Sequence, residues 1–350
     1  MGAKIPVTVI SGFLGSGKTT LLNRLLNGEP GSGAGSDAGR TVVLINELGD
    51  VRLEHERFRQ LSDRVVLLES GCICCAVRGD LVDALRQMFL DALYKRIPPF
   101  SRILLETTGL ADPAPVMYTL QYERFLADRY VYAGCITVVD AVHGMAQLQL
   151  HPEAVQQAVL ADVLLLSKTD VTNNEETLAL QQELQRLNTS AATLTTHVQP
   201  GLDALLDMAA QAPWHKAGQR SMWSGQAMGP RGGHAAVNVL TLAWAQPWGR
   251  AQGVRGLTRL LEAMGTGLLR LKGRVQFEGE QHASAVHAVH QHLYPLQEII
   301  NAQPVFPQED GASVLLFIFR GLEAATVLAQ IQASLPHGGR VLSSGGNFIQ

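Results

Sequence analysis

The stretch IPVTVISGFLGSGKT, residues 5–19, decides the fold class of this 350-residue chain. An apolar run of strand length, residues 5–10, leads directly into a sequence that fits G-x-x-x-x-G-K-[S/T]. Its glycines let successive backbone N–H groups turn toward phosphate oxygens, and the helix that follows adds its positive end. We expect Lys18 to reach the β- and γ-phosphates and Thr19 to offer its hydroxyl to Mg²⁺. The residues predicted to bind nucleotide here are Gly12, Gly15, Ser16, Gly17, Lys18, Thr19 and Thr20.

Short apolar runs, separated by amphipathic stretches such as residues 19–26, continue through the first 200 residues. These runs are apolar on both faces and rich in Val, Ile and Leu; they cover residues 41–45, 64–68, 103–105, 135–139 and 163–166. Continuous apolar strands between helices are typical of a parallel sheet with helices on both faces. The sequence therefore predicts an α/β fold, a P-loop NTPase domain over residues 1–211.

A segment rich in Gly, Pro, Ser, Trp and Met, residues 212–234, is the predicted linker. The runs beyond it follow a βαβββα order over residues 237–243, 254–264, 268–277, 283–290, 313–319 and 322–335. They predict a smaller α+β domain over residues 235–350. The Gly/Ser-rich residues 28–39 predict a disordered surface loop.

Composition excludes several function classes. The formal net charge is -3 and only 17% of residues are charged, which argues against a general nucleic-acid binder. No apolar run approaches the roughly 18 residues of a membrane helix, and no signal peptide follows Met1, so a cytoplasmic protein is expected. Three of the four cysteines cluster together, which favours metal binding or catalysis over a disulfide framework.

The motif Ser167-Lys168-Thr169-Asp170 directly follows an apolar run and resembles the [N/T]-K-x-D sequence that reads guanine in GTPases. The Asp170 carboxylate would accept hydrogen bonds from guanine N1–H and the 2-amino group, which adenine lacks. The stem of Lys168 would pack on the base plane, and Ser167 stands where Asn is usual. A simple helix N-cap is the alternative interpretation.

Glu106-Thr107-Thr108-Gly109 follows another apolar run. An acidic residue at the carboxyl end of a strand beside a phosphate loop can hold Mg²⁺ through water or orient the attacking water. Gly109 would let its backbone N–H approach the γ-phosphate. We therefore expect Lys18 and Glu106 to be the catalytic residues, although a charged strand end is common.

Cys72, Cys74 and Cys75 place three thiols within four residues, a ligand set that suits Zn²⁺, Cu(I) or a related thiophilic ion. No second CxxC completes a closed zinc ribbon, so the partial set suits a site that accepts and releases metal. Glu47, Glu69 or water would supply a fourth ligand.

A C-terminal group of histidines is an alternative metal site, although scattered surface histidines are commoner; its members are His282, His287, His290 and His292. On a strand, His290 and His292 would share a face. Cys135 lies inside an apolar run and is expected in the core.

One family combines these motifs in this order. The motifs are the loop 12–19, Asn46-Glu47, Gly71-Cys72-Ile73-Cys74-Cys75, Glu106-Thr107-Thr108-Gly109 with Asp112-Pro113, Asp140-Ala141, Ser167-Lys168-Thr169-Asp170 and Arg270-Leu271-Lys272-Gly273. The set resembles the CobW-type metal-chaperone GTPases, relatives of the urease and hydrogenase nickel-insertion GTPases. The resemblance covers nearly the whole chain.

The resemblance implies a slow, metal-modulated GTPase that uses GTP and Mg²⁺. It would bind Zn²⁺ or Co²⁺ at Cys72, Cys74 and Cys75, with Glu47 nearby, and deliver the ion to a metal-requiring client protein. Neither nucleic acid nor membrane is an expected partner, and an oligomer stays open. Many members carry a His-rich run between the domains, whereas the predicted linker here holds only His215 and His234.

Three competing functions remain open at the level of sequence. The first is a cobalt-handling protein of cobalamin biosynthesis, since thiolates accept both ions. The second is a metal-sensing interaction module in which GTP serves only as a switch. The third is an ATP-dependent small-molecule kinase, which would share the phosphate loop but have no need for Asp170.

Overall fold

The computed structural model describes residues 4–27, 41–47, 65–69, 76–196, 201–215, 237–299 and 312–345. The predicted Gly/Ser loop, the clustered cysteines and linker residues 216–234 lie outside the described residues. The chain divides into two compact units. Unit 1 comprises residues 1–147, 161–181 and 192–211, and unit 2 comprises residues 148–160, 182–191 and 212–350. The predicted domain boundaries stay a prediction.

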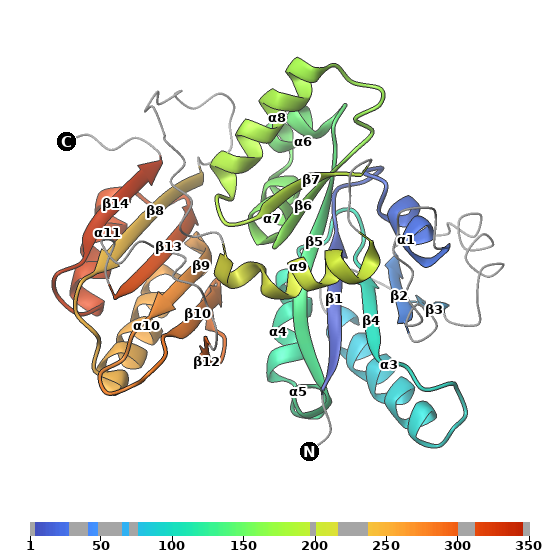
Figure 1. The fold of residues 1–350 in the computed structure, drawn as a ribbon, viewed down its shortest axis with the longest axis horizontal. Helices are drawn as coiled ribbons and strands as arrows, with labels where there is room; N and C mark the ends of the chain where they lie inside the picture. The colour runs from blue at the N-terminus through green and yellow to red at the C-terminus, as the bar shows by residue number, and fades with distance from the viewer. Residues whose placement is uncertain are drawn as a thin grey trace. The chain divides into compact units, whose positions relative to one another are not determined.

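A parallel sheet forms the centre of unit 1 (Figure 1). Its strands are β1 (Ile5–Ser11), β2 (Thr41–Glu47), β3 (Val65–Glu69), β4 (Arg102–Glu106), β5 (Tyr130–Asp140), β6 (Val163–Ser167) and β7 (Ala192–Thr195). Within the described residues the sheet has seven strands in the order β3-β2-β4-β1-β5-β6-β7, and every neighbouring pair is parallel. The predicted α/β class is therefore confirmed.

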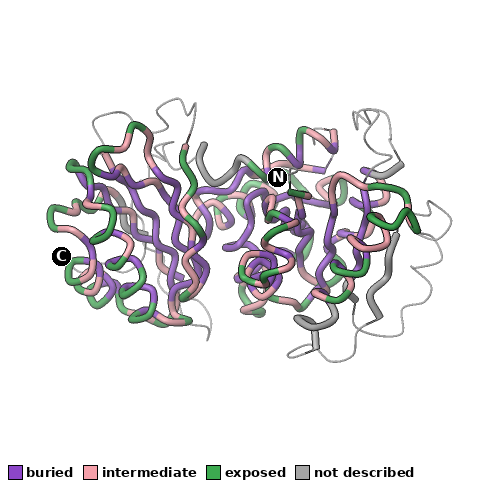
Figure 2. The backbone as a smooth tube through the Cα atoms, turned by 90° about the horizontal axis from the view of Figure 1, so that it is seen from below, coloured by how far each residue is buried: buried purple, intermediate pink, exposed green. Residues whose placement is uncertain are grey.

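Helices cover both faces of this sheet. They are α1 (Lys18–Asn27), α3 (Ala76–Leu93), α4 (Ala114–Tyr122), α5 (Arg124–Arg129), α6 (Gly144–Leu150), α8 (Asn174–Leu187) and α9 (Leu202–His215). Leucines of α1 and α9 pack on one face, and apolar side chains of α3, α4 and α5 pack on the other. Burial on both faces explains why β6 reads VLLLS with every residue buried. Figure 2 colours the backbone by burial, with the buried residues in purple.

Strand order brings several predicted site residues to one edge. In the strand register Glu106 lies beside Ile10 of β1 on one side and Ile45 of β2 on the other. Asp140 pairs with Ser167 at the ends of β5 and β6. Because the carboxyl ends of parallel strands meet at the same edge, the phosphate loop, Glu106 and Ser167 converge there.

Unit 2 is built on an antiparallel sheet. Its strands are β8 (Val237–Trp244), β9 (Leu268–Val275), β10 (Ser284–Val289), β11 (His292–Leu293), β12 (Gln297–Glu298), β13 (Ser313–Arg320) and β14 (Arg340–Gly345). The order is β11-β10-β9-β13-β8-β14, and β12 also pairs with β10. Helices α10 (Arg250–Met264) and α11 (Ala324–Ser334) bury one large apolar cluster against this sheet. Helix α7 (Pro152–Leu160) contributes Val155 and Val159 to a second cluster.

The predicted βαβββα order of the C-terminal part is incomplete. The structure adds β11, β12 and β14, and in unit 1 it adds β7. Strands β11 and β12 have two residues each, too few for a hydrophobic pattern. Strand β14 reads RVLSSG and is fixed by antiparallel pairing with β8, a long-range contact that local sequence does not encode.

Cys135 is fully buried in the core of unit 1, as predicted. None of the helices in the described part of the chain combines the length and the apolar character that a membrane span requires.

Candidate functional site

Three glycines shape the loop between β1 and α1. Gly12, Gly15 and Gly17 have positive φ values of 142°, 70° and 93°, which side chains of L-residues rarely adopt. A Cβ atom on Gly12 would lie 2.3 Å from the carbonyl oxygen of Val138. The loop therefore lies directly against β5, and a larger residue at Gly12 would displace it.

Lys18 is nearly buried and points into this loop. Its Nζ donates to the carbonyl oxygens of Gly12 at 2.9 Å and Phe13 at 3.2 Å. The hydroxyl oxygen of Ser16 is buried and has no hydrogen-bond partner among the described residues. A buried hydroxyl without a partner is costly unless a ligand satisfies it, so the loop fits a phosphate group.

Thr19 and Glu106 supply two oxygen atoms beside the loop. The Thr19 hydroxyl donates to Oε1 of Glu106 at 3.1 Å, and Glu106 is only 4% exposed. Hydroxyl and carboxylate oxygens are ligands that Mg²⁺ accepts, so these residues fit the ion predicted from sequence. When bound to nucleotide, Mg²⁺ would neutralise phosphate charge. The buried hydroxyl of Thr108 also has no partner among the described residues.

Gly109 packs against the loop from the side of β4. A Cβ atom there would lie 2.6 Å from Cδ2 of Leu14, 2.7 Å from its nitrogen and 2.8 Å from its Cα. Two of these atoms belong to the backbone, which yields less readily than a side chain. Glycine is therefore needed at this position for a close approach of two backbone segments.

The predicted guanine-reading segment lies against the same loop. The Ser167 hydroxyl donates to the carbonyl oxygen of Ser16 at 2.6 Å, and Lys168 Nζ donates to that of Gly15 at 2.9 Å. Asp170 is exposed. The helix N-cap alternative does not hold for Ser167, because α8 begins at Asn174 and the neighbouring Asn173 side chain accepts from a first-turn amide.

Asp140 was quoted from the sequence only as part of the family resemblance, with no role assigned to it. Its carboxylate accepts from Lys168 Nζ at 2.7 Å and from the amides of Val142 at 2.8 Å and His143 at 3.3 Å. Burial raises the pKa of this carboxyl, but these hydrogen bonds outweigh burial and hold the pKa below its ordinary value of 3.8. Its position at the carboxyl end of a strand, like that of Glu106, was the available signal.

The predicted metal ligands are only partly described. Glu47 and Glu69 are neighbours in the register of β2 and β3, and the structure describes their backbone but not their side chains. Cys72, Cys74 and Cys75 lie outside the described residues. Among the residues that are described, no group of three or more His, Cys, Asp or Glu side chains is placed to hold a metal ion.

The C-terminal histidines do not share a strand face. Strand β10 ends at Val289, and His290 has a left-handed φ of 50°, so the predicted strand over residues 283–290 is one residue too long at each end. The His290 ring nitrogens face the Leu268 carbonyl at 2.9 Å and Nε2 of Gln156 at 3.2 Å. The His287 ring stacks on Tyr294. These two rings therefore have structural contacts within unit 2.

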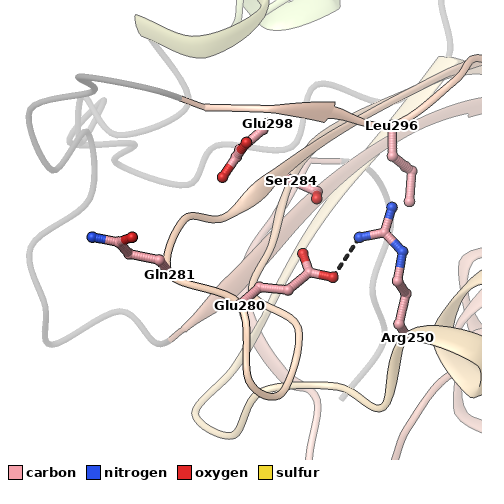
Figure 3. A pocket seen from close by; sticks show the side chains of 6 residues that line it. All are labelled: Arg250, Glu280, Gln281, Ser284, Leu296 and Glu298. Atoms are coloured by element: carbon pink, nitrogen blue, oxygen red, sulfur yellow. Dashed lines mark hydrogen bonds and ion pairs between the residues drawn. The ribbon is translucent and has the colours of Figure 1, made fainter.

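A pocket of about 310 Å³ lies in unit 2 and contains no predicted site residue (Figure 3). Its lining residues are Arg250, Glu280, Gln281, Ser284, Leu296 and Glu298. The Arg250 guanidinium forms an ion pair with Glu280 and lies 5.1 Å from the centre of the Phe277 ring. The positive charge in this pocket is thus balanced by a neighbouring carboxylate.

Two family models match this chain. A family model described as the CobW/HypB/UreG nucleotide-binding domain matches residues 6–195, more than half of the chain. The chain belongs to the CobW/HypB/UreG family. A second model, the CobW C-terminal domain of cobalamin synthesis proteins, matches residues 242–335. The first model includes the phosphate loop, and the second includes most of the antiparallel sheet.

Several relatives of this CobW/HypB/UreG chain are named for zinc. It is 39% identical to the zinc chaperone YjiA of Escherichia coli over 194 residues, which are 55% of this chain and 58% of YjiA. It is 31% identical to zinc-regulated GTPase metalloprotein activator 1 of Schizosaccharomyces pombe over 199 residues, 55% of this chain and 46% of that protein. The chain spans about half the length of the curated relatives it matches.

Solved structures extend the likeness to both units. The Zn(II)-bound YjiA GTPase from E. coli matches with a TM-score of 0.64 at 26% identity, covering 96% of this chain and 100% of that one. A Zn(II)-bound triple mutant of YjiA, with one glutamate and two cysteines changed to alanine, matches with a TM-score of 0.66 at 25% identity and the same coverage.

Proposed function

We propose that this chain is a GTP-hydrolysing metallochaperone that binds Zn²⁺ and delivers it to a metal-requiring client protein. The observation that carries the proposal is the packing of Ser167 and Lys168 onto the phosphate loop, at the edge that also holds Thr19 and Glu106. A guanine-reading segment must lie beside the phosphate site to hold one nucleotide. The names of the zinc-linked relatives support the choice of cargo.

Guanine is the proposed base, with Lys168 packed on its plane and Asp170 as acceptor for its N–H groups. Lys18 and the loop N–H groups hold the phosphates, as the orphaned hydroxyl of Ser16 supports. Thr19 and Glu106 are the proposed Mg²⁺ residues, and Glu106 also orients the attacking water. Gly109 provides a backbone N–H near the γ-phosphate.

Cys72, Cys74 and Cys75 are the proposed thiolate ligands, with Glu47 as a further ligand. Strand order supports a site near the nucleotide, because β2 lies next to β4, and β4 lies next to β1. Glu69 is in register with Glu47 and precedes Cys72 by three residues, a chain length that spans at most about 11 Å. The ion is therefore expected on the β2–β3 side of the phosphate loop.

Nucleotide state is proposed to control metal affinity. Contacts of the γ-phosphate would order the segment around Glu47 and the cysteine loop, and loss of these contacts on hydrolysis would reshape the thiolate site. A ligand shifts an equilibrium only when it binds the two states differently, so metal affinity must differ between GTP-bound and GDP-bound protein.

Cobalt handling in cobalamin biosynthesis is a second candidate. The model that matches residues 242–335 carries a cobalamin-synthesis name, and thiolates accept Co²⁺ as well as Zn²⁺. A non-enzymatic metal-sensing switch predicts metal and GTP binding without metal-dependent turnover. An ATP-dependent kinase predicts that any preference for GTP over ATP survives Asp170→Ala.

One titration tests cargo and coupling together. Purified protein is titrated with Co²⁺, and then with Zn²⁺ in competition, in the presence of either GDP or a non-hydrolysable GTP analogue. We expect thiolate-to-cobalt absorption, displacement by Zn²⁺, and different metal affinities in the two nucleotide states. Equal affinities would remove the coupling, and stronger retention of Co²⁺ than of Zn²⁺ would favour the cobalt candidate.

Matched variants separate the two sites. Changing Cys72, Cys74 and Cys75 together to Ser should abolish the absorption and leave GTP binding intact, with buried Cys135 unchanged. Lys18→Ala should abolish nucleotide binding or turnover and leave the absorption. Because a YjiA mutant lacking two cysteines is also Zn(II)-bound, retained tight metal in the cysteine variant would redirect the search to histidines.

A further inference from the structure

Asp140 is an almost completely buried carboxylate at the carboxyl-end edge of the parallel sheet, beside the phosphate loop. It is 1% exposed and ends β5. Lys168 is its cationic partner, and the Asp140 carboxylate also accepts hydrogen bonds from two backbone amides. A buried carboxylate needs such partners, because burying an ionised group without hydrogen bonds or a charge partner is costly.

Lys168 is constrained at both ends. Its backbone has a left-handed φ of 58°, and its ammonium donates to both Asp140 and the carbonyl oxygen of Gly15. The Lys168 side chain is 41% exposed, whereas its ammonium is held by these two acceptors. With the ammonium held at these two acceptors, the partly exposed side chain has its stem as the part proposed to pack on a purine base.

We propose that Asp140 is a positioning residue that fixes the ammonium of Lys168 on the phosphate loop and so presents the Lys168 stem to the nucleotide base. This inference rests on the proposed binding of guanine nucleotide. The ion pair would help nucleotide binding through entropy as well as electrostatics. A lysine without this anchor would lose its rotamer freedom only when nucleotide binds, which would weaken the affinity. Asp140 removes that cost before the ligand arrives.

A double-mutant cycle measures the coupling. The variants are Asp140→Asn, Lys168→Met and both together, and the readout is the affinity for a fluorescent GDP in the presence of Mg²⁺. Asn keeps an oxygen for the backbone amides but loses the negative charge. We expect each single change to weaken GDP binding about tenfold, and Asp140→Asn to cost less than about twofold further when Met already replaces Lys168.

Asp162 provides a matched control. It is also a buried carboxylate, and it accepts from the Cys135 amide and the Tyr132 hydroxyl, both at 2.8 Å, before β6 begins. Asp162→Asn should lower the melting temperature and leave GDP affinity unchanged. A similar loss of affinity in both variants would show that any buried carboxylate in these strands has the same effect, and would overturn the inference.

The remaining outcomes are also decisive. GDP binding by Asp140→Asn equal to that of the unmodified chain, or additive losses in the double variant, would overturn the positioning role. No GDP binding by the unmodified chain would overturn the proposed function and this inference with it. If the Asp140→Asn single variant does not fold, the double variant is compared with Lys168→Met alone. A further loss of GDP affinity in the double variant would contradict the positioning role of Asp140.

Discussion

At the scale of single residues, the candidate site depends on close approaches that tolerate one residue type. Gly12 and Gly109 lie against backbone atoms of β5 and of the phosphate loop. Lys18, Ser167 and Lys168 bind carbonyl oxygens of that loop. Loop geometry is therefore set by contacts from several strands as well as by its own glycines.

Gly109→Ala tests this packing. Since a Cβ atom would lie within 2.8 Å of Leu14 backbone atoms, the loop must move. We expect nucleotide affinity to fall about tenfold, with a loss of about 1–3 kcal/mol in the free energy of unfolding. Isothermal titration with GDP and urea denaturation measure the two effects.

Gly249→Ala is the control for that change. At Gly249 the nearest atom to a new Cβ is Oε2 of Glu278 at 3.8 Å, so no neighbour has to move. Its GDP affinity should match that of the unmodified chain. If Gly109→Ala binds GDP as tightly as the unmodified chain does, the close contact with Leu14 does not affect nucleotide binding.

The lowered pKa of Asp140 predicts that its contribution to the stability of the fold is lost in acid. Its pKa is lower in the folded chain than its ordinary value of 3.8, so its ionised form stabilises the fold above that value. The stabilisation is lost as the pH falls through the folded pKa. Urea denaturation between about pH 6 and pH 3 should therefore show the difference in unfolding free energy between the unmodified chain and Asp140→Asn shrinking toward acid. A difference independent of pH would contradict this.

At the scale of elements, hydrophobic pattern predicted the buried strands and the helices at residues 19–26, 254–264 and 322–335, which correspond to α1, α10 and α11. Strands β1, β2, β4 and β5 are apolar on both faces because helices cover both sides of the sheet there. Strand β7, with only four residues, and strand β14, with a polar sequence, escaped prediction because pairing with a neighbour fixes them. Their position depends on long-range contacts.

The contact between α10 and α11 gives an element-level prediction. A Cβ atom on Gly256 of α10 would lie 2.3 Å from the Ser334 carbonyl oxygen at the end of α11. Gly256→Ala should therefore force the two helices apart and lower the free energy of unfolding by about 1–3 kcal/mol. Arg255→Ala, exposed on the same helix, is the control. Thermal unfolding of both variants is the measurement. Equal melting temperatures for Gly256→Ala and Arg255→Ala would contradict the close packing of α10 against α11.

At the scale of the whole molecule, the chain alternates between unit 1 and unit 2 several times. Residues 148–160 and 182–191 belong to unit 2 although they precede and follow the segment that carries Lys168. Val159 and Leu187 from these segments are buried with Val239 and Leu269. Neither unit is therefore made of one uninterrupted stretch of chain.

This interleaving predicts cooperative unfolding. We expect one calorimetric transition, which GDP with Mg²⁺ raises by binding the folded state; at one hundred times the dissociation constant the gain is about 2.7 kcal/mol. Gly256→Ala in unit 2 should lower the same transition. Two transitions, with GDP shifting one and Gly256→Ala the other, would show that the units unfold independently.

The sequence by itself determined the phosphate loop, the parallel sheet and the chemistry of the candidate ligands, because spacing and apolar runs are local properties. Only the tertiary structure placed β4 beside β1, joined Lys168 to Asp140 across 28 residues, and set Gly109 against Leu14. Those facts depend on strand order and backbone approach. Both arise from packing between segments far apart in the chain, and no local pattern of residues records them.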